Sequence, residues 1–78
     1  MPDPLAKQAF KLVKAELDRA TVTHGVFPTI HHGYGVIKEE FREFEDEVFR
    51  REVDRDALVE EATQLAAMAI RFLVDVAL

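Results

Sequence analysis

Apolar residues recur at steps of three and four positions along most of the chain, the spacing that places side chains on one face of an α-helix. The first such stretch opens at Asp3 and Pro4, a favourable N-cap followed by proline at the first helical position. It should fade over residues 20–23, ahead of a stop signal at Gly25. The apolar positions of this first predicted helix are Leu5, Ala9, Leu12, Val13 and Leu17.

A second helix should follow a loop at residues 22–29. We expect Thr29 to be its N-cap, which makes His32 the third helical position. The helical pattern then runs from Tyr34 to about Arg51. The apolar residues that share one face of this helix are Tyr34, Ile37, Phe41, Phe44 and Val48.

A third helix should begin after a short connection, with either Asp54 or Asp56 as its cap, and continue to about Ala77. Because the connection is short, the second and third helices should pack antiparallel. The inner face of the third helix is expected to carry Leu58, Ala62, Leu65, Ala69, Phe72, Leu73 and Val76. The predicted fold class is therefore all-α, with a three-helix protomer that forms a helical bundle through oligomerisation.

Length and composition restrict the chain to one domain, residues 1–78. A domain this small buries only about 60% of the surface that its unfolded chain exposes, and it usually depends on a staple, a metal or a partner subunit. The chain has no cysteine, which excludes disulfides and thiolate metal sites. Phe49, Val59 and Ile70 fall outside the apolar stripes, so we expect a homodimer or a homotetramer.

The formal net charge of −5 argues against binding to a nucleic acid polymer, whose backbone is itself negative. It is compatible with a phosphorylated small substrate whose charge is neutralised by a metal. The N-terminal residues lack the pattern of a secretory signal, and Arg71 and Asp75 interrupt the apolar stretch near the C-terminus. We therefore expect a cytoplasmic protein that does not span a membrane.

Acidic residues crowd the second helix, and their angular positions suggest where they point. At 100° per residue, Glu40, Glu43 and Glu47 fall on one flank beside the apolar stripe. Glu61 and Gln64 fall on the flank of the third helix that faces the same side of an antiparallel pair. To within one turn, Glu43 should lie level with Gln64 and Glu47 level with Glu61. The sequence thus predicts an oxygen-rich patch shared by two helices.

This patch is either an ordinary solvated flank or a site for a divalent cation. Like charges at such spacing destabilise a helix and raise one another's pKa, and a bound cation removes that cost. Mg²⁺ prefers oxygen ligands and retains waters, at positions where phosphate oxygens can bind.

The stretches HHGYGVIKEEFREFEDEV and EEATQLAAMAIRFLVD resemble the MazG-like, all-α nucleoside triphosphate pyrophosphohydrolases, in particular the short phage-type members. The resemblance runs from about Phe27 to the C-terminus. It implies a Mg²⁺-dependent enzyme, with Mn²⁺ as a substitute metal, that converts a nucleoside triphosphate to the monophosphate and pyrophosphate. A related possibility is a phosphoribosyl-ATP pyrophosphohydrolase, and a different class is a helical oligomerisation module without catalytic activity.

The resemblance also implies residue roles. Glu40, Glu43 and Glu61 would be metal ligands, as would Gln64, which stands where most of the superfamily has Asp. Glu39 would be the catalytic residue that orients or deprotonates the attacking water. Since a glutamine offers only a neutral amide oxygen, Gln64 should weaken metal affinity unless Glu47 or a partner chain supplies charge.

Four further residues are candidates for substrate binding, each with a structural alternative. His31 would contact a phosphate or cap the helix, and Tyr34 would stack on a base or belong to the core. Lys38 would neutralise phosphate or pair with a neighbouring Glu. Arg71 would face the triphosphate from the third helix or pair with Asp75.

Overall fold

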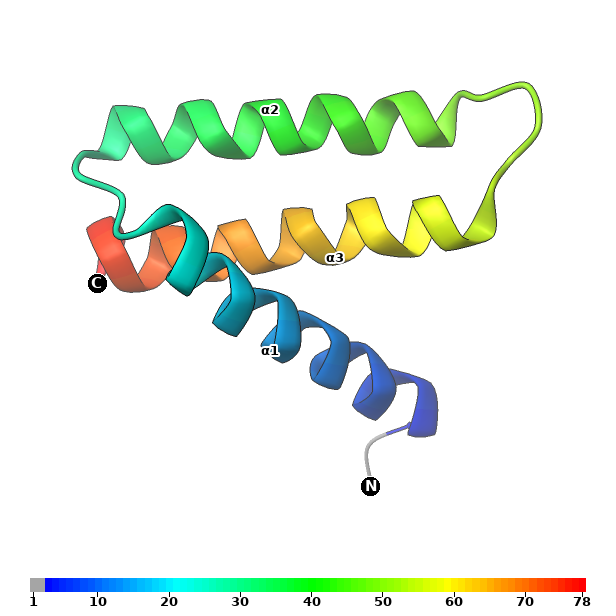
Figure 1. Ribbon diagram of the computed structural model, residues 1–78, viewed down its shortest axis with the longest axis horizontal. Coiled ribbons are helices and arrows are strands. Elements are labelled where there is room, and N and C mark those ends of the chain that lie inside the picture. The colour runs from blue at the N-terminus through cyan, green and yellow to red at the C-terminus, as the bar shows by residue number, and fades with distance from the viewer. Residues whose placement is uncertain (1–2) are drawn as a thin grey trace.

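The computed structural model describes residues 3–78, and within that range it contains three α-helices and no strand. The helices are α1 (Pro4–His24), α2 (Ile30–Val48) and α3 (Arg55–Phe72), and α3 continues into a π-helical turn, η1 (Leu73–Ala77) (Figure 1). In η1 the Leu78 N–H donates to the Leu73 carbonyl across five residues, at 2.8 Å. The predicted all-α fold class is confirmed.

Each helix begins at the cap that the sequence predicts. The Asp3 side chain accepts a hydrogen bond from the Leu5 N–H at 2.7 Å, and Thr29 Oγ1 accepts one from the His32 N–H at 3.0 Å. Asp54, rather than Asp56, caps α3. The predicted end of α2 at about Arg51 is too late, because the Phe49 N–H closes the last helical bond to Glu45 and the chain then reverses.

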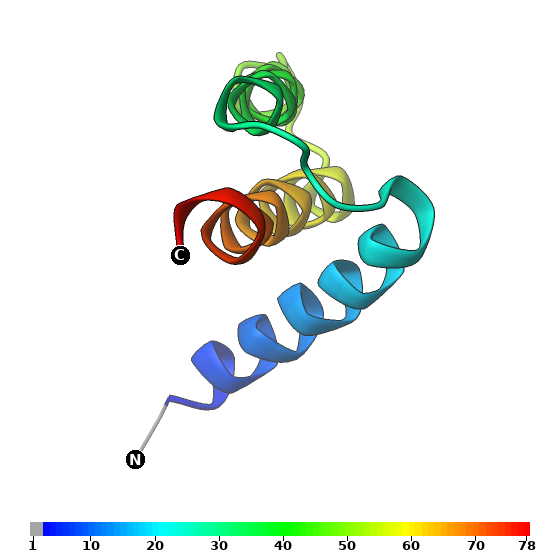
Figure 2. The ribbon, with the colours of Figure 1, turned by 90° about the vertical axis from the view of Figure 1, so that its left-hand side faces the viewer.

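α3 is the central helix. α2 runs antiparallel alongside it, as predicted, and α1 packs on another side (Figures 1 and 2). The C-terminal half of α1 lies close to α3, and its N-terminal half diverges into solvent. Among the residues whose burial the structure describes, the buried apolar ones are Ala20, Phe27, Ala67 and Met68.

The apolar stripe predicted for α2 is rotated in the structure. Tyr34, Phe41 and Val48 are exposed. Ile37 of the predicted stripe does face the core, together with Gly33 and Val36, which the stripe did not include. Gly33 permits this close approach, because a Cβ there would lie 2.8 Å from Phe72 and 2.9 Å from Phe27. The same rotation turns Glu40, seven residues after Gly33 and so on the same helix face, toward α3.

The inner face of α3 is shifted from the predicted stripe, because the helix packs against two neighbours. Ala67, Met68 and Arg71 are its buried residues, and Ala62, Ala69 and Leu73 of the predicted stripe are exposed. The helix face that carries Met68 and Arg71 also carries Glu61, so an acidic side chain is brought toward the interior.

Candidate metal centre

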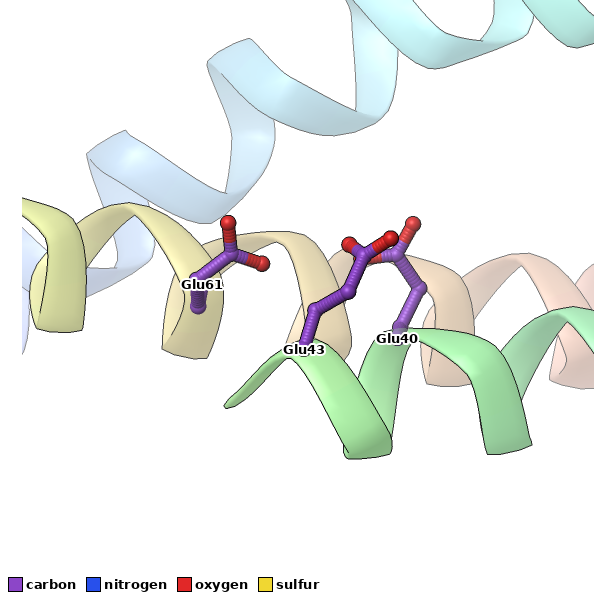
Figure 3. A group of neighbouring side chains, drawn as sticks. All are labelled: Glu40, Glu43 and Glu61. Atoms are coloured by element: carbon purple, nitrogen blue, oxygen red, sulfur yellow. The ribbon is translucent and has the colours of Figure 1, made fainter. Parts of the chain in front are cut away.

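Three carboxylates from two helices converge on one side of the α2–α3 pair. Glu40 and Glu43 come from consecutive turns of α2, and Glu61 comes from α3 (Figure 3). One carboxylate oxygen of each residue lies within 4.8 Å of the others. This spacing is suitable for three ligands of one cation, which requires oxygens about 2.0–2.6 Å from the ion.

The cluster contains two polar atoms that the fold leaves without partners. Glu40 Oε2 and Glu61 Oε2 are both buried and accept no hydrogen bond. Burial of an unpaired carboxylate oxygen is costly, and native structures rarely leave such atoms unsatisfied without a bound ion or a water. The unsatisfied oxygens and the all-oxygen donor set therefore fit a hard divalent cation such as Mg²⁺.

Burial and mutual repulsion raise the pKa values of two of the three carboxyl groups. Burial, and then the charges of Glu43 and Glu61, raise the pKa of Glu40 from its ordinary value of 4.5 to about 7. Burial also raises the pKa of Glu61, with Glu43 as the next contributor. Without a cation, then, Glu40 takes up a proton as the pH falls through about 7.

The residue of α2 that lies level with Glu61 of α3 differs from the sequence prediction by about one turn. Apart from burial, Glu43 is the main influence on the Glu61 pKa, and Glu47 acts more weakly. Glu47 is paired with Arg50 at 3.1 Å. Glu43, rather than Glu47, is thus the counterpart of Glu61.

Gln64, predicted as a fourth ligand, makes its hydrogen bond within its own helix. Its Nε2 donates to Glu60 Oε1 at 3.4 Å. The contact that the structure gives Gln64 therefore runs along α3 and does not cross to α2.

Glu39 and Lys38 lie at the edge of the cluster. Glu39 and Glu40 both line a pocket of about 250 Å³ whose other walls are Phe27, His32, Val36 and Met68. On its other side Glu39 borders an open depression that also contains Lys38, Arg42 and Glu43. Glu39 is thus placed between the carboxylate cluster and solvent.

His31 and Tyr34 are both exposed on the first turns of α2. His31, Tyr34 and Lys38 follow one another at steps of three and four, so they share one solvent-facing side of α2. The predicted capping role belongs to Thr29 and not to His31.

Arg71 is not available to a substrate in this structure, and its structural alternative is the one observed. The side chain is buried, with an exposed fraction of 2% for the residue. Its Nη1 donates to the Ala20 carbonyl at 3.2 Å, and its Nη2 donates to Asp75 Oδ2 at 3.1 Å. The guanidinium carbon also lies 4.9 Å from the centre of the Phe27 ring.

Sequence reasoning missed the contribution of α1. Glu16, which is paired with Arg19, contributes to the raised pKa of Glu40 on α2. A signal was present, because Glu16 follows Leu12 by four residues and so continues the apolar side of α1. A carboxylate from α1 therefore belongs to the same electrostatic environment.

No protein-family model matches the chain, and no curated protein or solved structure is similar enough to count as a match. Across residues 3–78, none of the helices combines the length and the apolar character that crossing a membrane requires.

Proposed function

We propose that the protein is a Mg²⁺-dependent nucleoside triphosphate pyrophosphohydrolase of the MazG-like type, which releases a nucleoside monophosphate and pyrophosphate. The observation that supports this most directly is the convergence of Glu40, Glu43 and Glu61, with two buried carboxylate oxygens lacking partners. Without a cation such a site destabilises the folded protein, and a bound cation removes this destabilisation. The resemblance of the flanking sequence to that superfamily supplies the reaction class.

In this proposal Glu40, Glu43 and Glu61 would hold Mg²⁺ or, in its place, Mn²⁺. The bound ion would supply Lewis acidity to the phosphates and a more acidic water. Glu39, at the edge of the cluster, orients that water or accepts its proton. Gln64 is retained as a supplementary ligand of the proposal, reached by a rotation of its side chain away from Glu60.

Positive charge for the phosphates comes from Lys38, which lies in the open depression beside Glu39 and Glu43. His31 and Tyr34 share its side of α2 and extend the proposed substrate surface toward the start of the helix. We further propose that the enzyme acts in the cytoplasm as a homodimer or homotetramer. Within residues 3–78 of a single chain, sixteen large apolar side chains are exposed, which favours association.

The proposal is tested by incubating the protein with a panel of nucleoside triphosphates and Mg²⁺, and measuring pyrophosphate release. We expect product from at least one nucleotide, and a loss of about 100-fold or more in Glu43→Gln, which removes a metal ligand. Glu45→Gln is the matched control, because Glu45 is an exposed acid on the same helix outside the cluster. Absence of pyrophosphate from every nucleotide, in protein shown to be folded, would contradict the proposal.

A helical oligomerisation module without catalytic activity is the second candidate. Two observations favour it: the hydrogen bond of Gln64 within α3 and the large exposed apolar surface. Calorimetric titration with Mn²⁺ separates the two functions. The enzyme should bind the ion and lose binding in Glu43→Gln, whereas the module should give no heat with either protein.

A further inference from the structure

The single chain exposes more surface than a protein of its mass usually does. A folded monomer of 8.9 kDa typically exposes about 4,800 Å², whereas this chain exposes 6097 Å². The Cα radius of gyration is 13.3 Å, against about 11.5 Å for a compact domain of this length. The excess, about 1,300 Å², is larger than the roughly 800 Å² that each partner contributes to a standard interface.

Part of this surface lies in a groove between α1 and α3. The groove has a volume of about 480 Å³, and only Gln8 and Thr63 among its lining residues are polar. The others are Leu5, Ala9, Leu12, Val13, Val59, Ala62 and Ala66. It opens because the N-terminal half of α1 diverges from α3 (Figures 1 and 2).

The groove side of α1 is the apolar face of an amphipathic helix, and no other segment of residues 3–78 covers it. Leu5, Ala9 and Leu12 point into the groove, and Lys7, Lys11 and Lys14 lie on the opposite side of the helix. Yet Leu5 keeps 74% of its surface exposed. Farther along the same helix, Val13 and Leu17 pack against the core, so the apolar stripe is used at one end only.

The border of the groove has the composition of an interface rim. A second, adjoining depression shares Leu12, Val59 and Thr63 with it and adds the charged residues Glu16, Arg19, Asp56 and Glu60. Protein interfaces combine an apolar centre with a polar, hydrated edge in this way. The row of Tyr34, Phe41 and Val48 on α2 is also exposed, but it lies along one helix and lacks a second wall.

We infer that the α1–α3 groove is the surface through which two copies of this chain associate, with the N-terminal half of each α1 seated in the groove of the other. A two-fold arrangement lets one patch serve both subunits. The groove spans Leu5–Val13 on α1, about 12 Å, or two turns, which suits an apolar helix segment of the same length. The assembled α1 and α3 helices of the two copies form a four-helix bundle.

This inference does not depend on the enzymatic proposal, and its test is the state of association of the full chain. Light scattering with size-exclusion chromatography should give a mass of at least twice 8.9 kDa. Leu12→Lys should raise the dissociation constant about 30-fold or more, the effect of losing a central contact. Phe41→Lys is the matched control, since Phe41 is an exposed apolar residue of α2 outside the groove. It should leave the association intact.

A second measurement keeps the inference testable if Leu12→Lys fails to fold. Because the chain has no cysteine, one introduced thiol reports contact between copies. Gln8→Cys, in the groove, should form an inter-chain disulfide on mild oxidation, and Phe41→Cys should not. A tetramer that Leu12→Lys divides into smaller species also supports the groove. A chain that is monomeric at every concentration, or an assembly that Leu12→Lys leaves intact and that cross-links through Phe41→Cys, overturns the inference.

Discussion

α3 carries a charged side chain toward the interior at two places, about ten residues or 15 Å apart. The polar groups find partners at one of these places and lack them at the other. Around Arg71, the guanidinium meets the Ala20 carbonyl, the Asp75 carboxylate and the Phe27 ring. Around Glu61, three carboxylates meet each other, and two of their oxygens have no partner.

The pKa values of the carboxyl groups shift in opposite directions at the two places. A hydrogen bond from the Phe27 N–H, together with Arg71, lowers the pKa of Asp75, whereas burial and neighbouring carboxylates raise the pKa of Glu40. The Arg71 network satisfies its polar groups from within the chain and fixes the loop before α2 to the end of α3. In the carboxylate cluster, by contrast, two buried oxygens have no partner. Unsatisfied charge of this kind is the usual mark of a functional site, and satisfied charge that of a structural one.

The largest effect should come from breaking the satisfied network. Arg71→Met removes the hydrogen-bond donor of the Ala20 carbonyl and the counter-charge of Asp75, which keeps only the Phe27 N–H. We expect a loss of about 3–5 kcal/mol in the free energy of unfolding. Urea denaturation followed by circular dichroism measures it. Arg50→Met is the control, since Arg50 makes a solvent-exposed pair with Glu47 and should cost at most about 1 kcal/mol. Equal losses in the two variants would refute a structural role for Arg71.

A smaller loss should follow from disturbing the close contact that holds α2 against α3. Gly33→Ala places a methyl group 2.8 Å from Phe72 and 2.9 Å from Phe27 and should cost about 1–3 kcal/mol. Gly35→Ala meets nothing within 4 Å and should instead stabilise the helix by up to about 1 kcal/mol. Thermal unfolding of both variants gives the comparison. A neutral Gly33→Ala would mean that this contact does not set the rotation of α2.

The carboxylate cluster should respond in the opposite direction to the Arg71 network. Glu40→Gln removes a repelled, buried charge, so in EDTA it should stabilise the protein by about 0.5–2 kcal/mol. The same variant should lose the rise in unfolding temperature that Mg²⁺ or Mn²⁺ gives the wild type. Glu45→Gln should change stability by no more than about 0.5 kcal/mol. If Glu40→Gln destabilised the metal-free protein, the cluster would be a structural feature like the Arg71 network.

A further effect is the pH dependence of stability without metal. The pKa of Glu40 is about 7 in the folded protein and 4.5 ordinarily, so the folded state binds the extra proton between these values. Stability should therefore fall as pH rises from about 4.5 to about 7, and less so in Glu40→Gln. Urea midpoints in EDTA across this range measure the slope; identical slopes in the two proteins would count against the assignment.

The Arg71 network and the carboxylate cluster also differ in how their contributions to stability depend on pH. The lowered pKa of Asp75 contributes stability that is present above its ordinary value of 3.8 and is lost as pH falls through its folded value. Added Mg²⁺ should stabilise the protein more above pH 7 than at pH 5, because metal ligands must be deprotonated.

Some of this could be predicted from the sequence because it depends on neighbours along the chain. The starts of the helices follow from caps that bond two or three residues ahead, at Asp3, Thr29 and Asp54. The pairing of Glu40 with Glu43 follows from the helical period alone. The approach of Glu61 was predictable to within a turn, because a short connection makes α2 and α3 antiparallel.

The rest depends on how whole helices rotate and cross, which the local pattern does not contain. Tyr34 and Phe41 lie on the predicted apolar stripe and are exposed, whereas Val36 lies outside that stripe and packs against the core. The fit of Gly33 against Phe27 and Phe72 sets this rotation of α2. The same packing buries Arg71, with its partners Ala20 and Phe27 at least 44 residues away in sequence, and lets Glu16 on α1 act on Glu40 on α2.

The sequence by itself thus determined three capped helices and which carboxylates lie on the same helix face, because hydrogen bonds and side-chain spacing within a helix are local. Only the tertiary structure decided which of the charged residues are satisfied and which are left in need of a partner. That outcome depends on contacts between distant segments, where burial removes water and each charge must find its counterpart in another helix.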